Sequence, residues 1–548
     1  MKNKKLLTAL LLSFIILVAS VLRLYQLGIV PSSPDWDEVA LGYNAYSILT
    51  TGRDEYGQFI PIVLRSFDDY KPALYMYFIV PLIPVFGLDI ISVRLPSAIF
   101  GILTVLASYF LIKELFKRKD IAFLTSFLLA ISPMSIQFSR VAFETNTGAA
   151  FNIFGALFFI KGLKKPLWLI PAALFFGLNV SIYQSDRVFT PLFALALIII
   201  FWKQVFTLPK KYLIGAFLVG AIAILPLVIN MATNSKSLYR FKGVSIFSEP
   251  TTIKHEAEKR YVDDKNNANK AGVFFHNKWV AYSREIMSGY LSHYDLNWLF
   301  IRGDLVRHHA PSVGLMYLWE LPFLLLGIYS LVFHKFPAKT KLLIFTWFLL
   351  APVPAAVTNG VPHSVRTLNF LPTFQVFTAL GIISGVLFLN KYKFYGIRYL
   401  LFGGISLFAA FNFVYYLNQY FVQQNYFTSY DWQYGYKEAV PYVQKINSRY
   451  KKIVVSDRVP LDQSHMFFLF YLKYPPELYQ KAGNTSGGFL ESHKFNKYEF
   501  RPIDWKKEEK SHDILYVGRP QDFQSGGGNI LKTINYLDGK PAIVIIEG

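Results

Sequence analysis

Residues 1–22, MKNKKLLTALLLSFIILVASVL, place three lysines directly before a long apolar run. This pattern occurs both in cleaved signal peptides and in uncleaved first membrane helices. No clean small-x-small cleavage site precedes Leu22, and further apolar runs follow, which favours the uncleaved helix. Lys2, Lys4 and Lys5 would keep the start of this helix in the cytoplasm. The stretch that follows is then predicted to lie outside the membrane.

The composition extends this interpretation to the rest of the chain. Of 548 residues, 53% are hydrophobic, only 17% are charged, and the mean hydropathy is +0.32. A soluble chain of this length would carry more charge. The net charge of +21 comes largely from short clusters between apolar runs, which indicates membrane topology and no nucleic-acid partner. The absence of cysteine excludes disulfides and thiolate chemistry.

Apolar runs of spanning length predict about eleven membrane helices. Their expected ranges are 6–27, 95–116, 119–136, 143–162, 167–183, 188–203, 211–231, 314–333, 341–358, 368–389 and 398–421. With the N-terminus inside, the Lys-rich loops 113–120, 161–166, 203–212, 334–341 and 390–398 all fall on the cytoplasmic face, as the positive-inside rule requires. The apolar run 72–88 must then not cross, and its three prolines support a helix that lies in the outer interface.

Two parts are predicted to lie outside the membrane on the extracytoplasmic side. Residues 232–313 form a large polar, basic loop, and residues 28–94 form a first outer loop with an acidic motif. The tail 425–548 contains short β-branched runs (KKIVVSD, DILYVG, PAIVIIEG) separated by helix-compatible stretches, which predicts a small α/β domain. The expected division is therefore a transmembrane domain, 1–424, and an extracytoplasmic domain, 425–548.

Polar residues that are unusual for a membrane protein gather at the predicted outer ends of helices. They are Asp37, Glu38, Lys71, Arg140, Glu144, Asp186, Arg187, His363 and Arg366. A carboxylate can act as a general base on a hydroxyl or amine, while Lys and Arg can bind a phosphate and stabilise its charge as it leaves. Acids and bases together at the lipid boundary indicate a reaction with a lipid phosphate.

Each of these residues also has a purely structural interpretation. Asp37 and Glu38 follow Pro34 and suit the start of a helix, and Lys71 suits an interfacial anchor. Arg140 and Glu144 are four residues apart and suit an ion pair at a helix end. His308 and His309 are adjacent, so both cannot readily bind one metal ion from a regular element, and no metal site is predicted there.

The order of these motifs resembles a known family. Asp37-Glu38 follows the first helix, Lys71-Pro72 opens an interfacial helix, and RLPSAIFG (94–101) opens the next span. SRVAFETN (139–146), LSHYDLNWLFIRGDLVRHHAP (291–311), PHSVRTLNFLP (362–372) and DWQYGYKEAV (431–440) add to the likeness. The chain is similar to the GT-C glycosyltransferases of the protein O-mannosyltransferase and lipid A aminoarabinose transferase type. The resemblance covers the membrane part well and the last hundred residues poorly.

The resemblance implies roles for single residues. Asp37 corresponds to the catalytic base, with Glu38 as its support, and Glu144 is the nearest match to a second acid. Lys71 matches the lysine that contacts the donor phosphate, and Arg366, His363 and Arg140 are further candidates for phosphate binding. This chain has KPALY where the aminoarabinose branch tends to have a second proline, so the sugar and acceptor of that branch do not carry over.

The predicted function is therefore the transfer of one sugar, a mannose-like hexose or a relative of it, from a polyprenyl-phosphate donor to a protein, glycan or lipid acceptor. The reaction would invert the anomeric centre at the outer face of the plasma (inner) membrane. The need for a divalent cation, Mg²⁺ or Mn²⁺, stays open. A lipid-linked oligosaccharide ligase is the closest alternative, followed by a secondary transporter, whose ionisable residues would lie near mid-bilayer.

Overall fold

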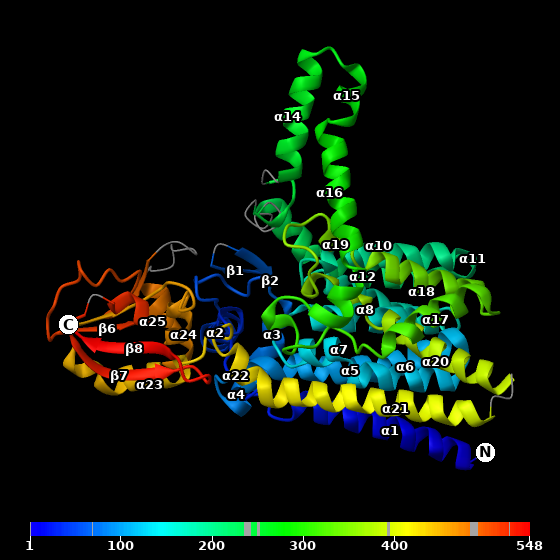
Figure 1. The fold of residues 1–548 in the computed structure, drawn as a ribbon, viewed down its shortest axis with the longest axis horizontal. Coiled ribbons are helices and arrows are strands. Elements are labelled where there is room, and N and C mark those ends of the chain that lie inside the picture. Colours follow the sequence, from blue (N-terminus) through cyan, green and yellow to red (C-terminus); the bar gives the residue numbers. More distant parts are fainter. Residues whose placement is uncertain are drawn as a thin grey trace. The chain divides into compact units, whose positions relative to one another are not determined.

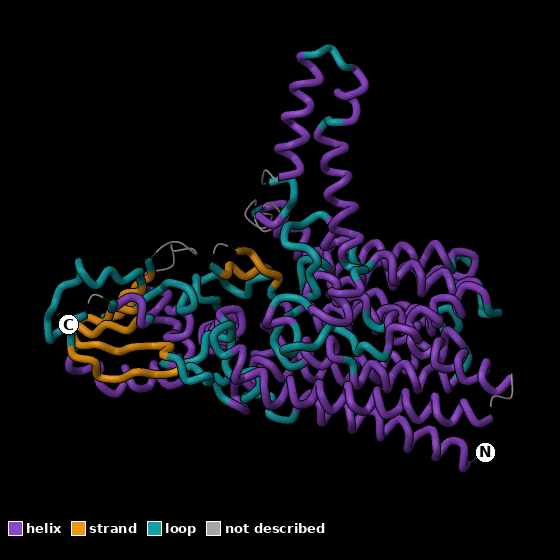
Figure 2. The backbone as a smooth tube through the Cα atoms, in the orientation of Figure 1, coloured by secondary structure: helices purple, strands orange, loops and turns teal. Residues whose placement is uncertain are grey.

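The computed structural model describes residues 2–67, 69–234, 243–248, 252–391, 395–482, 492–524 and 526–548. The chain forms two compact units, each built from several segments. Figures 1 and 2 show its helices and strands. The first unit comprises Met1–Ala19, Gly101–Ile136 and Glu144–Phe413, and the second comprises Ser20–Phe100, Gln137–Phe143 and Val414–Gly548. Four helices have residues in both units: α1 (Lys2–Leu24), α5 (Ile90–Phe116), α7 (Pro133–Ser139) and α21 (Tyr395–Asn418).

Among the described residues of the first unit, all the regular elements are helices. Its helices are α6 (Lys119–Ile131), α8 (Thr145–Gly162), η2 (Pro166–Trp168), α9 (Leu169–Asn179), α10 (Asp186–Ile200), α11 (Trp202–Val205), α12 (Lys210–Thr233), α14 (Thr252–Asn266), α15 (Lys270–Phe275), α16 (Lys278–Ser292), η4 (Trp298–Arg302), η5 (Val306–His308), α17 (Glu320–Phe333), α18 (Ala338–Leu350), α19 (Val353–Ala356), η6 (Val365–Phe370) and α20 (Thr373–Lys391).

Six helices among the described residues are long and apolar enough to cross a membrane. A seventh span is added if α6 and α7, which meet at a bend of 58°, count as one. The chain is thus a multi-pass membrane protein, as its apolar runs predict. Other expected spans, such as 167–183 and 314–333, are shorter apolar helices, so the number eleven stays a prediction. The run at 72–88 forms a short helix over Leu74–Phe86, interrupted near its prolines.

The polar loop of the first unit is largely helical. In Figure 1, α14 and α16 run side by side and are joined through α15. Residues 235–242 and 249–251 of the predicted loop 232–313 lie outside the described residues, as do residues 392–394 of the Lys-rich stretch 390–398.

The second unit contains all strands of the described residues. Its elements are α2 (Trp36–Thr51), β1 (Val63–Ser66), β2 (Asp69–Pro72), α3 (Leu74–Ile79), η1 (Val80–Leu82), α4 (Ile83–Phe86), η7 (Gln419–Gln423), α22 (Gln424–Thr428), α23 (Tyr436–Ile446), η8 (Asn447–Arg449), β3 (Lys452–Val455), α24 (Ser464–Tyr471), α25 (Pro476–Lys481), β4 (His493–Phe495), β5 (Tyr498–Phe500), β6 (Ile514–Gly518), η9 (Pro520–Phe523), β7 (Asn529–Asn535) and β8 (Pro541–Glu547).

The C-terminal part of this unit is an α/β domain, which confirms the predicted class. Its six-stranded sheet has the order β4-β5-β3-β6-β8-β7, with β5, β3 and β6 parallel and the outer strands antiparallel. Side chains alternate along β3: Ile453 and Val455 join the apolar core with α23 and α24, while Val454 packs on the opposite face with Trp505. Both faces are therefore covered, which explains the continuous apolar runs of its central strands.

Candidate active site

Three acids, Asp35, Asp37 and Glu38, start helix α2. The Asp35 carboxylate accepts the Glu38 backbone N–H at 2.9 Å, and Glu38 Oε2 accepts the Asp35 N–H at 3.4 Å, which forms a capping box. A capping box satisfies backbone donors that no residue within the helix can reach. Two of the three acids are therefore used to fix the first turn, and Asp37 stands between them.

Glu38 is also held by a buried arginine. Arg94 Nε and Nη2 each donate to one oxygen of Glu38, both at 2.8 Å, and neither side chain is exposed. The remaining Arg94 donors bind the carbonyl oxygens of Leu27, Pro31 and Ser33. Arg94 thus joins the chain before α2, the first turn of α2 and the start of α5.

Asp37 is the acid of this group that stays accessible. Its side chain is 33% exposed and forms an ion pair with the ammonium of Lys71, whose side chain is 13% exposed. Lys71 lies on β2, paired across the hairpin with Leu64 of β1. Helix α2 and the hairpin thus bring together an acid and a base that are 34 residues apart in the sequence.

Arg140 is buried in the break after α7. Its guanidinium donates to the carbonyl oxygens of Leu22, Gln26 and Val30 and to the Tyr420 hydroxyl. These contacts fix the end of helix α1 and the residues that follow it in the sequence. A part in phosphate binding stays a prediction for Arg140, since most of its donors face protein oxygens.

The α/β domain packs directly on the acidic helix. Gly42 of α2 lies against Phe470 of α24, where a Cβ atom would come within 2.6 Å of the ring. The Tyr43 hydroxyl donates to the Tyr474 carbonyl at 3.1 Å, and the Trp36 N–H donates to Gln433 Oε1 at 3.2 Å. The helix that carries Asp37 is therefore supported by residues from the last quarter of the chain.

The other predicted residues belong to the first unit. Glu144 is nearly buried at the N-cap of α8, and α7 ends at Ser139, so Glu144 and Arg140 do not share a helix. Arg366 lies at the start of η6, half-buried, and its Nη1 donates to Thr358 Oγ1 and the Asn359 carbonyl, both at 2.6 Å. Because these residues and Asp37 fall in different units, their roles remain separate predictions.

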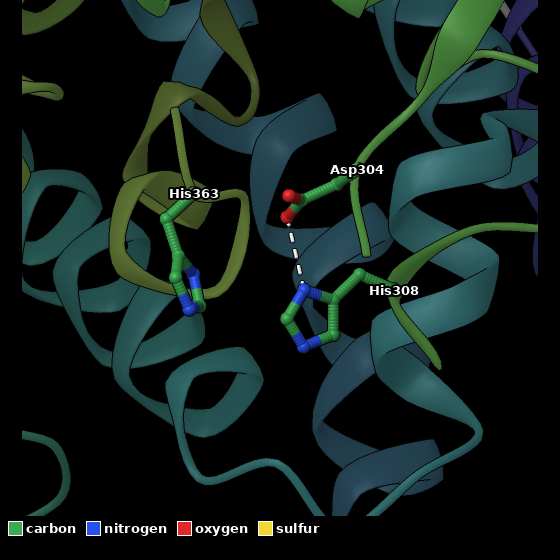
Figure 3. Close-up of side chains that lie close together, drawn as sticks. All are labelled: Asp304, His308 and His363. Atoms are coloured by element: carbon green, nitrogen blue, oxygen red, sulfur yellow. Dashed lines mark hydrogen bonds and ion pairs between the residues drawn. The ribbon is translucent and has the colours of Figure 1, made fainter. Parts of the chain in front are cut away.

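In the first unit, His363 lies beside an acid, Asp304, and its partner His308 (Figure 3). Asp304 accepts a hydrogen bond from His308 Nδ1 at 2.9 Å and from the Ser364 N–H at 2.7 Å. Burial, and then the positive charge of Arg366, lower the pKa of His363 to about 3, while burial lowers the pKa of His293 to about 4. Burial alone would raise the pKa of Asp304, but the hydrogen bond from His308 holds this pKa below its usual range.

A buried polar network lies among the helices of the first unit. Asp186 Oδ1 accepts from the side-chain amides of Asn152 (3.2 Å) and Asn369 (2.8 Å). Thr190 Oγ1 donates to Asn152 Oδ1 and accepts from Asn179. These bonds connect α8, α9, α10 and η6, so Asp186 contributes to the packing of the bundle.

Sequence reasoning assigned no role to Arg94, Asp304 or His308. Arg94 stands in the RLPSAIFG motif, but a single arginine in an apolar span is also typical of a helix end. Asp304 and His308 have helical spacing in a loop, and their partner His363 is far along the chain. The signal for Arg94 was a charged residue inside a predicted span. The signal for Asp304 and His308 was an Asp and a His four residues apart.

Residues 70–229 match the family model described as dolichyl-phosphate-mannose-protein mannosyltransferase. The fold is similar to ArnT from Cupriavidus metallidurans bound to undecaprenyl phosphate (TM-score 0.55, 10% identity, 100% of this chain and 98% of that chain). It is also similar to ArnT from the same organism in the apo state (TM-score 0.53, 11% identity, 99% and 98% of the two chains). The search of curated proteins found no match.

These comparisons confirm the family resemblance that the motifs indicate. The family model covers the segment from Lys71-Pro72 to α12, and the fold match extends over the whole chain, including the C-terminal domain. The chain therefore has a fold similar to that of ArnT, and its residues 70–229 match the family model of the dolichyl-phosphate-mannose-protein mannosyltransferases.

Proposed function

We propose that this protein transfers a single sugar from a polyprenyl-phosphate donor to a hydroxyl or amine acceptor at the outer face of the plasma membrane. The observation that carries this proposal is the accessible Asp37–Lys71 pair, set on the buried Glu38–Arg94 pair. The family segment and the ArnT fold support a lipid-linked sugar as the donor.

In this proposal Asp37 is the general base. Its carboxylate takes the proton from the acceptor O–H or N–H, and the acceptor atom forms a bond to the anomeric carbon. The bond between that carbon and the phosphate oxygen breaks, and polyprenyl phosphate leaves with the electron pair. A single displacement inverts the anomeric centre, and a well-placed base typically contributes about 10²- to 10⁴-fold to the rate.

Lys71 binds the leaving phosphate. A donor phosphate close to the β1–β2 hairpin would draw the Lys71 ammonium away from Asp37. The Asp37 carboxylate would then be free to take the proton from the acceptor. Lys71 would then offset the charge that grows on the departing oxygen. A part in phosphate binding is proposed for Arg366, and that of a second acid for Glu144, on the family resemblance alone.

Glu38 is proposed to hold Asp37 in place and to take no part in the reaction itself. Its oxygens accept from Arg94, from the Asp35 N–H and from the Ala142 N–H (2.9 Å), so they fix the turn that presents Asp37. The C-terminal α/β domain packs on the same helix, α2, and supports it as well.

Transfer of radiolabel from a panel of polyprenyl-phosphate monosaccharides tests the proposal. Membranes that hold the native chain, Asp37→Asn or Asp120→Asn are compared. Asp120 is a matched control because it also stands in the first turn of a helix and pairs with a basic side chain, Arg118. We expect the native chain and Asp120→Asn to transfer label, and Asp37→Asn to lose at least about 100-fold of the rate.

Two outcomes would contradict the proposal. Near-normal transfer by Asp37→Asn would remove Asp37 as the base. Failure of the native chain to consume any monosaccharide phosphate, with consumption of a diphosphate-linked oligosaccharide, would favour the oligosaccharide ligase instead.

A further inference from the structure

We propose that Asp304, His308 and His363 bind a divalent transition-metal ion, with zinc the best match to this set of ligands. The three residues come from two segments of the first unit, the loop around η5 and the loop before η6. One candidate ligand atom from each residue lies within 4.8 Å of the others. This inference goes beyond the proposed sugar transfer and does not depend on it.

The chemistry of the ligands favours zinc. Two imidazole nitrogens and one carboxylate oxygen are a common protein ligand set for Zn²⁺, with a fourth position left for water or a substrate oxygen. Mg²⁺ and Ca²⁺ prefer oxygen ligands throughout. A set dominated by nitrogen is therefore distinct from the Mg²⁺ or Mn²⁺ site that the sequence left open.

The geometry already approaches that of a metal site. His308 Nδ1 and Asp304 Oδ2 are 2.9 Å apart, and the ring centroids of His308 and His363 are separated by 5.1 Å. Ligand atoms about 2.1 Å from a tetrahedral zinc ion are about 3.4 Å from one another. Figure 3 shows His363 beside the Asp304–His308 pair, and the three candidate ligand atoms, all within 4.8 Å of one another, would approach by at most about 1.4 Å to reach this spacing.

An Asp–His ion pair explains only part of this arrangement. Asp304 and His308 satisfy each other, but His363 Nδ1 is buried and has no hydrogen-bond partner among the described residues. Buried polar atoms without a partner are rare and call for an explanation. A metal ion between the three side chains would supply the missing interaction of this nitrogen.

The surrounding residues hold the three side chains in place. The His363 backbone N–H donates to His293 Nε2 at 3.1 Å, and the Ser364 N–H and hydroxyl both donate to Asp304 Oδ2. Outer contacts of this kind orient the ligands of protein metal sites. Residue 303, directly before Asp304, is a glycine at φ +72°, a left-handed backbone conformation that other residues rarely adopt.

His309 provides a natural control. It is adjacent to His308, yet its Nδ1 lies 2.8 Å from the Ala310 carbonyl and 3.0 Å from the Val313 carbonyl. Its imidazole is thus held by its own loop. The two adjacent histidines therefore have different neighbours: His308 lies beside Asp304 and His363, whereas His309 contacts carbonyl oxygens of its own loop.

Cobalt binding tests the site without any assay of activity. The full-length protein is purified in detergent through an affinity tag free of histidine, stripped with a chelator and titrated with Co²⁺, whose visible absorption reports a site of low coordination number. We expect one Co²⁺ per chain, displaced by Zn²⁺, in the native protein and in His309→Ala. In Asp304→Asn, His308→Ala and His363→Ala we expect affinity at least about 100-fold lower, since outer contacts alone change it by roughly 10- to 100-fold.

A gain of signal separates loss of a ligand from loss of folding. The chain has no cysteine, so any thiolate-to-cobalt charge-transfer band must come from an introduced one. We expect this near-ultraviolet band in His363→Cys with Co²⁺ and none in the matched His309→Cys. Native protein that binds no Co²⁺, binding as tight as that of the native protein in all three ligand variants, or a band of the same strength in His309→Cys would each overturn the proposal.

Discussion

Arg94 binds both carboxylate oxygens of Glu38 at 2.8 Å in a pair that solvent does not reach, one residue away from the accessible Asp37. The two neighbouring acids thus have opposite environments. Glu38 is buried in an ion pair with Arg94 and caps the first turn of α2, which fixes the position of this turn. Asp37 faces a lysine that a phosphate could draw away. The buried pair therefore sets the position of the accessible pair.

Loss of Arg94 should destabilise the protein strongly. Arg94→Gln leaves the Glu38 carboxylate buried without its partner, for which we expect a cost of about 3–5 kcal/mol. The exposed pair Arg118–Asp120 supplies the control, and Arg118→Gln should cost less than about 1 kcal/mol. Thermal unfolding in detergent compares the two, and equal midpoints would show that the buried pair is dispensable.

The charge of Lys71 should matter for rate more than for folding. Without the ammonium beside the leaving phosphate, Lys71→Gln is expected to lower the rate of sugar transfer by about 100-fold. Lys71→Arg keeps the charge and should retain part of the rate. Lys117→Gln removes a lysine that is 58% exposed and paired with Glu114, and should leave transfer unchanged. Equal rates in the Lys71 and Lys117 variants would contradict the role of Lys71.

The sequence predicts the membrane class and the central strands of the C-terminal domain for clear physical reasons. The runs KKIVVSD, DILYVG and PAIVIIEG appear as β3, β6 and β8, because strands buried on both faces are almost continuously apolar. Strand β7 was missed because most of its side chains are partly or fully exposed and its pairing with β8 has two register shifts. Its pattern therefore differs from that of a buried strand.

The candidate sites were predictable only in part. Both Asp37 and Lys71 stand out in the sequence, but their contact depends on the β1–β2 hairpin, whose strands have four residues each. The Asp304–His308–His363 group was not predicted, because its members come together only when the loop around η5 meets the loop before η6. Contacts between distant segments depend on tertiary packing, which local patterns do not encode.

A pH-dependent effect is expected at Glu55. Burial raises the pKa of this carboxyl to about 8, despite the hydrogen bond from the Asn44 amide. Because the folded protein holds this proton more tightly than the unfolded chain, stability is lost as the pH rises from about 4.5 to about 8. Across this range the free energy of unfolding is expected to fall by up to about 1.4 kcal/mol for each rise of one in pH.

Glu55→Gln should remove this dependence. The gain in unfolding temperature of the variant over the native protein should be small at pH 5 and should grow up to about pH 8. Glu477→Gln, which changes an exposed glutamate in the first turn of α25, serves as the control and should show no such trend. A constant difference between Glu55→Gln and the native protein across this range would show that Glu55 does not carry the buried proton.

Gly148 should be intolerant of a side chain because of the buried network around Asp186. A Cβ atom at residue 148 would overlap Asp186 Oδ2 and lie 2.9 Å from Asp186 Cγ. The carboxylate would have to move, which breaks its bonds to Asn152 and Asn369; crowding of this kind typically costs about 1–3 kcal/mol. Gly148→Ala should therefore lower the midpoint of thermal unfolding.

Gly220→Ala is the matched control for this change. Gly220 also lies in an apolar helix, α12, but its Cβ would meet nothing closer than 3.6 Å. Alanine is there expected to be neutral or to stabilise the helix by up to about 1 kcal/mol. Thermal unfolding of the two variants in the same detergent gives the comparison. If Gly148→Ala were as stable as Gly220→Ala, the Asp186 carboxylate would have room to move, and the network could not be what fixes the packing of α8 against α10.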